Sequence, residues 1–223
     1  MYGVKRMREK IIDLSYPLRD DMLVYPKNRR PVFEWLGRDN SEGYNLTYLQ
    51  MIVHTGTHVD SPLHFIGGGQ TIDAVELSRL YGKTKVFCCR QEPRAQEVLI
   101  RDIMDDPDEL QEGSIFLLRT GIEVFAEQEL YNYRYPCPSQ ELIDLLIGKR
   151  IRSYMTDATS IDPVGSPDSP NHHRILGAGI PIVENLCNLD QLEGAGTFTI
   201  SAIPLSLYLR EGSPCRAIAI IGD

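Results

Sequence analysis

The chain has 223 residues, a hydrophobic content of 42% and a formal net charge of −8. No basic cluster is longer than residues 5–8, which argues against nucleic acid and anionic membrane as main partners, because both select clustered Lys and Arg. No run approaches the roughly 20 apolar residues that span a bilayer, and residues 1–14 lack the apolar stretch of a signal peptide. We therefore expect a cytoplasmic protein.

Short runs rich in Ile and Val, bounded by Gly, Pro or Asp, predict strands along most of the chain. In chain order they cover residues 11–14, 48–53, 85–89, 114–119, 180–183, 198–202 and 217–221. Their irregular spacing does not require a doubly wound parallel sheet. We expect one mixed α/β domain over residues 1–223.

Helical patterns are fewer than strand patterns. Residues 139–146 combine helically spaced aliphatic side chains with the capping residue Ser139. Two shorter helices are predicted at residues 73–80 and 121–128. A further short helix is expected with Asp168 or Ser169 as its cap, Pro170 at its first position and Gly177 at its end.

The segment HTGTHVDSPLHF, residues 54–65, contains three of the five histidines. His54, His58, Asp60 and His64 are separated by even intervals, so an extended chain places all four on one face. On a helix, Asp60 and His64 would point away from the other two. Pro62 also disfavours a helix here. The pattern therefore predicts extended backbone.

A straight strand, however, would separate His54 from His58 by about 13 Å. Two ligands of one metal ion cannot lie so far apart, because each bonds at roughly 2.0–2.2 Å. The segment must therefore bend. We expect the bend at Gly56, which tolerates unusual backbone angles, and a second corner at Pro62.

Two neutral imidazoles and a carboxylate are a typical ligand set for Zn²⁺ or Mn²⁺ with positions open to water. The alternative is a hydrogen-bonded polar loop without metal. The density of three histidines and an aspartate favours metal. The remaining histidines lie at 172 and 173, and a helix followed by a reversing strand would bring His172 and Glu184 to the same site.

Residues 54–65 resemble the HxGTHxDxPxH signature of the cyclase superfamily, which includes bacterial kynurenine formamidases and isatin hydrolases. The segments IIDLSYPLRDDMLVYP and TDATSIDP, and the late stretch around Glu184, are also similar to that family. The resemblance implies a swivelling β/β/α fold, a metal-dependent amide hydrolase and a homodimer or homotetramer.

The resemblance also implies a ligand set. His54, His58 and Asp60 would hold a first metal ion, and Asp60 would bridge to a second ion held by His172 and Glu184.

Roles for two further residues follow from the same resemblance. His64 would be the catalytic acid–base residue, and Tyr25 would contact substrate. We choose His172 over His173 because the family pattern places its histidine twelve residues before the glutamate. Tyr25, Trp35, Tyr44 and Tyr48 are candidates for an aromatic wall, although aromatic side chains also pack cores and interfaces.

The function implied by the resemblance is hydrolysis of an aryl formamide such as N-formylkynurenine, releasing formate, with one or two Zn²⁺ per chain or with Mn²⁺. A first alternative is a cyclic amide such as isatin. A second alternative is a metal-binding protein without turnover. His64 favours the enzymes, because a structural site needs no fourth polar group beside three ligands.

Overall fold

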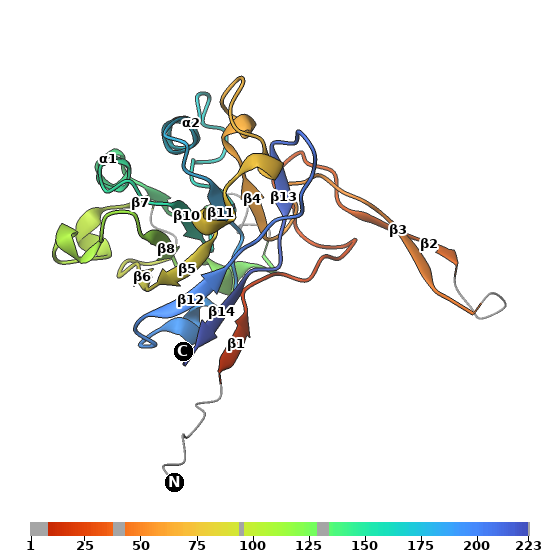
Figure 1. Ribbon diagram of the computed structural model, residues 1–223, viewed down its shortest axis with the longest axis horizontal. Coiled ribbons are helices and arrows are strands. Elements are labelled where there is room, and N and C mark those ends of the chain that lie inside the picture. The colour runs from red at the N-terminus through yellow and green to blue at the C-terminus, as the bar shows by residue number, and fades with distance from the viewer. Residues whose placement is uncertain (1–8, 38–42, 94–95, 129–133, 223) are drawn as a thin grey trace, which may run out of the picture.

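The computed structural model describes residues 9–37, 43–93, 96–128 and 134–222. Two sheets and a layer of helices form the body of the molecule, and a two-stranded arm extends away from it (Figure 1). None of the helices in these described ranges is long and apolar enough to cross a membrane.

The smaller sheet has four antiparallel strands and joins the two ends of the described chain. Its strands, in spatial order, are β1 (Lys10–Asp13), β14 (Ile218–Ile221), β12 (Phe198–Ser201) and β5 (Tyr81–Thr84). Three of them are predicted at residues 11–14, 198–202 and 217–221, and these predictions are confirmed within one or two residues. β5 was not predicted.

The larger sheet has six strands and is mixed. In spatial order they are β13 (Gly212–Pro214), β4 (His58–Asp60), β11 (Ile182–Glu184), β10 (Ser153–Thr156), β8 (Ile115–Arg119) and β6 (Val86–Cys88). The last four run parallel to one another, whereas β4 pairs antiparallel with both of its neighbours, β11 and β13. Two further short strands, β7 (Glu97–Val98) and β9 (Cys137–Pro138), pair with each other.

Strand β8 shows how the layers are held together. Ile115 and Leu117 belong to a core with β1, β12 and β14 of the smaller sheet. Phe116 and Leu118 point the other way, into a core with the helices α1 (Gln140–Gly148) and α2 (Pro170–Gly177). Successive side chains of a strand face opposite sides of its sheet, so β8 is apolar throughout. The result is a β/β/α arrangement, and the predicted mixed α/β fold is confirmed.

Both main helices begin where the sequence predicts, but only α1 is capped as predicted. The Ser139 hydroxyl accepts a hydrogen bond from the backbone N–H of Leu142 at 3.1 Å. At α2, Ser169 occupies the cap position with a φ of 37° and makes no side-chain cap bond. Asp162 from the preceding loop instead accepts hydrogen bonds from the first free N–H groups, so the expected cap by Asp168 or Ser169 is wrong.

The predicted helices at 73–80 and 121–128 are also wrong. The first is two separate 3-10 turns, Ile72–Ala74 and Leu77–Arg79, and the second is one turn, Ile122–Phe125. Between the first two turns, Val75 and Glu76 have extended backbone. The apolar spacing that resembled a helix instead buries single side chains of these turns, such as Ile72 and Ile122, in the core. Further 3-10 turns lie at Pro62–His64, Ile100–Asp102, Pro107–Glu109 and Leu189–Leu192.

The arm consists of β2 (Val32–Gly37) and β3 (Leu46–Gln50), which pair antiparallel (Figure 1). The predicted strand at residues 48–53 corresponds to β3 but is displaced, since β3 begins at Leu46 and ends at Gln50. The large apolar side chains on the arm are 43% to 58% exposed: Val32, Trp35, Leu36, Tyr44, Leu46, Tyr48 and Leu49.

Candidate metal centre

The backbone bends sharply between the arm and β4. Gly56 has a φ of 65°, a left-handed conformation that glycine adopts without strain. The Thr57 hydroxyl accepts a hydrogen bond from the N–H of Tyr16 at 3.0 Å and donates one to the carbonyl of Asn185 at 2.5 Å. These bonds hold the bend between the N-terminal segment and the end of β11. Pro62 then opens the 3-10 turn Pro62–His64, which is the second corner expected from the sequence.

Strand alternation decides where the polar side chains of β4 point. Val59 packs into the core between the two sheets, so His58 and Asp60 face the side that carries α2. Strand β11 pairs antiparallel with β4 and sets Glu184 directly opposite His58. The Glu184 carboxylate therefore reaches the same face of the sheet as His58 and Asp60.

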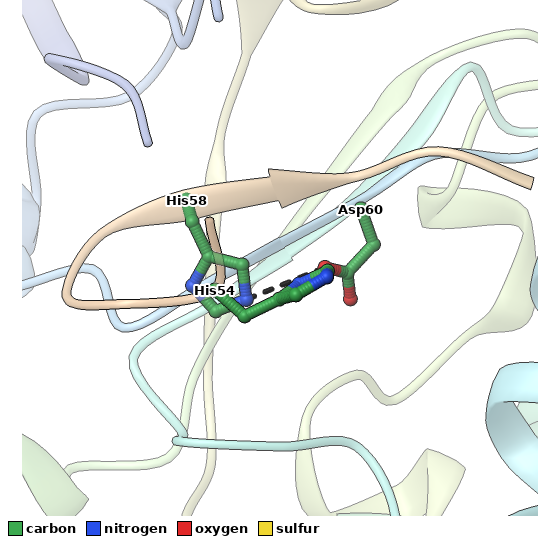
Figure 2. A group of neighbouring side chains, drawn as sticks. All are labelled: His54, His58 and Asp60. Atoms are coloured by element: carbon green, nitrogen blue, oxygen red, sulfur yellow. Dashed lines mark hydrogen bonds and ion pairs between the residues drawn. The ribbon is translucent and has the colours of Figure 1, made fainter. Parts of the chain in front are cut away.

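The first group of potential ligands consists of His54, His58 and Asp60, whose side chains point toward one another (Figure 2). His54 Nδ1 lies 2.6 Å from Asp60 Oδ1, and His58 Nε2 lies 3.3 Å from the same oxygen. His58 Nδ1 is 2.8 Å from the carbonyl oxygen of Gly56. Because a carbonyl only accepts, that contact requires a hydrogen on Nδ1 and makes Nε2 the nitrogen that can bind a metal ion once it is unprotonated.

The second group consists of Asp60, His172 and Glu184, so Asp60 belongs to both groups. His172 Nε2 lies 3.3 Å from Glu184 Oε1 and 3.8 Å from Asp60 Oδ2. His172 is 5% exposed, whereas His173 on the next position of α2 is exposed and belongs to neither group. Tertiary structure thus brings together the five residues expected as ligands, and their role as ligands remains a prediction.

His64 lies beside both groups without joining either. Its ring stacks on His54 at 3.9 Å between centroids and lies 6.1 Å from the ring of His172. Phe65 contacts the ring of His64 edge-on and stacks on His172. Burial lowers the pKa of His64 to about 4. A neutral imidazole at this position has one nitrogen able to accept a proton.

The electrostatics of the centre call for a cation. Asp60 and Glu184 are 1% and 4% exposed, and their carboxylates face one another. Burial together with nearby Asp60 raises the pKa of Glu184. At Asp60 burial acts in the same direction, but His54 and His58 outweigh it and hold the pKa well below its usual value.

The histidines show the same demand for positive charge. Burial opposes protonation of His58 and His172, yet the neighbouring carboxylates outweigh it. Asp60 and Glu184 raise the pKa of His58 to about 9, and Asp162, Glu184 and Asp60 raise that of His172 to about 10.

Several polar atoms at the centre test whether a metal ion would fit. Asp60 Oδ2, Glu184 Oε1 and His54 Nε2 are buried and make no hydrogen bond among the described residues. The 3.3 Å approach of His172 to Glu184 Oε1 is an ion-pair contact without hydrogen-bond geometry. Buried polar atoms are rarely left unsatisfied, and nitrogen and carboxylate oxygen are donors that Zn²⁺ and Mn²⁺ accept. The residues therefore fit a divalent ion.

A cavity of about 380 Å³ opens onto this centre. Tyr25, half-buried, contributes to its lining together with Phe65, Ser160 and Asn185. Tyr25 therefore lines the cavity, and its contact with substrate remains a prediction. The other aromatic candidates, Trp35, Tyr44 and Tyr48, lie on the exposed arm and do not line this cavity.

The sequence analysis did not identify Glu211 and Gly212, which lie next to His54 at the start of β13. Gly212 on β13 pairs with Asp60, and a Cβ atom there would lie 2.7 Å from His54 Cε1. Glu211 Oε1 is 3.7 Å from His54 Nε2. Nothing in the local sequence marks these residues, because β13 reaches β4 only through the fold. Asp162, by contrast, belongs to the quoted motif TDATSIDP.

Fold and site together define a β/β/α protein with a buried histidine–carboxylate centre, arranged as in metal-dependent hydrolases, which keep water and substrate beside the metal. The profile of the family described as Putative cyclase matches residues 12–163. The chain therefore belongs to the cyclase family. His172 and Glu184 lie beyond the matched residues.

Known proteins resemble the chain over nearly its whole length. It is 29% identical to the kynurenine formamidase of Bacillus thuringiensis subsp. konkukian (strain 97-27), covering 93% of this chain and 95% of that protein. The solved isatin hydrolase A from Labrenzia aggregata, bound to benzyl benzoate, superposes with a TM-score of 0.82 at 26% identity, covering 96% and 94% of the two chains. A structure described as a predicted metal-dependent hydrolase from Bacillus stearothermophilus gives a TM-score of 0.77 at 25% identity, covering 96% and 99%. The cyclase-like fold implied by the resemblance is thereby confirmed.

Proposed function

We propose that this chain is a metal-dependent hydrolase that cleaves the C–N bond of a small amide, with an aryl formamide such as N-formylkynurenine as its substrate. The observation that carries the proposal is the pair of potential ligand groups that share Asp60 and whose other members line one cavity. The names of the relatives, kynurenine formamidase and isatin hydrolase, point to the same chemistry.

The metal is proposed to be Zn²⁺, one or two ions per chain, with Mn²⁺ as the alternative. His54, His58 and Asp60 would hold one ion, and Asp60, His172 and Glu184 the other. When bound, such an ion supplies Lewis-acid chemistry, which lowers the pKa of water and polarises a carbonyl.

His64 is the residue best placed to move protons. It lies beside both ligand groups, 3.9 Å from the His54 ring and 6.1 Å from the His172 ring, and lines the cavity. Its neutral ring can take a proton from the attacking water and then deliver it to the departing nitrogen. An aniline-type nitrogen leaves more readily than an alkyl amine, which suits an aryl formamide.

The cavity fits a small, flat substrate. Its volume of about 380 Å³ lies toward the lower end of the range for small-molecule sites. Tyr25 and Phe65 offer aromatic faces, and Ser160 and Asn185 offer polar groups. A cyclic amide such as isatin is the second candidate, and the likeness to an isatin hydrolase supports it.

Turnover assays test the proposal directly. Protein reconstituted with Zn²⁺ or Mn²⁺ is incubated with N-formylkynurenine and with isatin, and metal content is measured before and after chelation. We expect formate from the first substrate, loss of activity on chelation and recovery on adding metal. Retained metal with no turnover of either amide would instead favour the metal-binding protein without catalysis.

We also propose that the protein is a homodimer or homotetramer, and that it works in the cytoplasm. The exposed apolar side chains of the arm support assembly, since an isolated two-stranded hairpin is marginally stable in water. Light scattering coupled to size exclusion gives the mass. Leu36→Asp on the arm is expected to shift it toward the monomer, whereas the control Leu77→Asp, exposed elsewhere, leaves it unchanged. A monomeric wild type would refute the assembly.

A further inference from the structure

Asp162 is a buried carboxylate that lies next to the centre but belongs to neither ligand group. Its backbone is fixed on both sides: its N–H donates to the Ser160 hydroxyl at 3.3 Å, and its carbonyl accepts from the Tyr135 hydroxyl at 2.9 Å. The side chain therefore has a set position at the start of α2.

The carboxylate accepts three hydrogen bonds from the first turn of α2. Oδ1 accepts from the backbone N–H of Asn171 at 2.9 Å, and Oδ2 accepts from that of His172, also at 2.9 Å. Oδ2 also lies 2.7 Å from Nδ1 of the His172 ring. Two of these donors are backbone amides, so Asp162 acts here as an acceptor.

That role settles the orientation and tautomer of His172. Because Asp162 accepts, Nδ1 of the His172 ring carries a hydrogen, and Nε2 is the nitrogen that can bind a metal ion once it is unprotonated. Nε2 is the atom that faces Glu184 and Asp60. Phe65 stacks on the ring at 4.5 Å between centroids and restricts its rotation.

We propose that Asp162 is a positioning residue, which fixes the His172 ring so that Nε2 can bind a divalent ion together with Asp60 and Glu184. The inference rests on the proposed metal-dependent function. Asp162 then has two roles, because the same carboxylate caps the N-terminus of α2 and orients the His172 side chain on that helix. Carboxylates behind ligating histidines commonly orient them in this way.

Asp162→Asn tests the proposal without any assay of turnover. The amide has a single acceptor oxygen, so one of the donors of α2 must lose its partner. We expect the ion that His172 binds to be held about 10–100-fold more weakly, measured by competition of Zn²⁺ with a chelating dye. The ion held by His54 and His58 should keep its affinity.

Two comparisons separate positioning from a loss of stability. Asp157→Asn changes another buried aspartate of the same loop, whose carboxylate accepts from the N–H groups of Thr120 and Gly121. It should lower the melting temperature while leaving Zn²⁺ affinity unchanged. Asp162→Glu, which keeps a carboxylate, should recover part of the affinity that Asp162→Asn loses.

Nitrogen-15 NMR of the Zn²⁺-loaded protein gives an independent signature. The wild type should show a slowly exchanging ring N–H of His172 at Nδ1, and Asp162→Asn should lose it or broaden it. A role limited to starting α2 would not move this resonance.

The possible results distinguish a failure of the positioning role from a failure of the proposed metal-dependent function. A wild type that binds no divalent ion would defeat the metal-dependent function itself. A wild type whose ion is weakened by His172→Ala but not by Asp162→Asn would defeat only the positioning role. In the His172→Ala background, Asp162→Asn should change metal affinity no further, and any additional loss would also overturn the proposal.

Discussion

The two ligand groups that meet at Asp60 are assembled by different means. His54, His58 and Asp60 come from seven consecutive residues, and His58 is oriented by the Gly56 carbonyl two positions away. His172 and Glu184 come from a helix and a strand, and His172 is held by a carboxylate ten positions earlier. The first group depends on a local bend. The second depends on α2 and β11 both packing correctly against the sheet.

The two ligand groups should differ in how strongly they respond to changes elsewhere in the fold. The bend before β4 depends on the left-handed Gly56 and on the hydrogen bonds of Thr57 to the backbone of Tyr16 and Asn185. The second group needs the pairing of β4 with β11 and the docking of α2 at once. Changes far from the centre should therefore weaken the second group before the first.

Removing Asp60, which both ligand groups share, should have the largest effect on metal binding and activity because it affects the two groups alike. Asp60→Ala takes one carboxylate from both groups, so both are expected to lose their ion. We expect kcat/KM to fall by at least about 1,000-fold, or roughly 4 kcal/mol, and metal content after dialysis to fall toward zero. Asp105→Asn, an exposed aspartate paired with Arg90, is the matched control and should change neither. Full metal content in Asp60→Ala would contradict the shared site.

His64→Ala separates proton transfer from metal binding. His64 belongs to neither ligand group, so the variant should keep its metal while kcat falls by about 100- to 10,000-fold. Metal analysis and steady-state kinetics measure the two effects on one sample. His173→Ala, exposed on α2, should leave both quantities unchanged. Loss of metal from His64→Ala would show that this histidine is a ligand.

Gly212→Ala tests the wall behind the first group alone. The new methyl group would lie 2.7 Å from His54 Cε1 and 2.9 Å from the carbonyl of Val59, so His54 or β13 must shift. We expect a loss of about 1–3 kcal/mol in the free energy of unfolding and weaker binding of the first ion. Gly148→Ala, at the end of α1 with open space around it, is the control for denaturation and Zn²⁺ titration. If Gly212→Ala and Gly148→Ala had the same stability and Zn²⁺ affinity, the His54 side chain could accommodate the added methyl group without loss.

Tyr25→Ala should have the smallest effect, because Tyr25 lines the cavity but belongs to neither ligand group. We expect KM to rise by up to about tenfold, or about 1.4 kcal/mol, with metal content unchanged. Tyr208→Ala removes a tyrosine that is 76% exposed and outside the cavity, and it should behave as the wild type. A fall in metal content of Tyr25→Ala would move this residue from the cavity wall to the centre.

The sequence indicated the first group more completely than the second. Even spacing, Gly56 and Pro62 are local signals, and local backbone geometry follows from them. The same reasoning failed at residues 73–80 and 121–128, where short apolar spacing is shared by helices and by turns that bury a few side chains. It also failed at the cap of α2, because the residue that satisfies its N–H groups lies outside the helix and its immediate flank.

By itself, the sequence determined the mixed α/β character, the bend at Gly56 and the clustering of His54, His58 and Asp60, because each of these depends on residues within a few positions of one another. Only the tertiary structure decided that Glu184 lies opposite His58 and that Gly212 leaves room for the His54 ring. It also decided that the side chain of Asp162, rather than that of Ser169, caps the first N–H groups of α2. Those contacts join segments distant in the chain. They arise from strand register and helix docking, which depend on how whole layers pack.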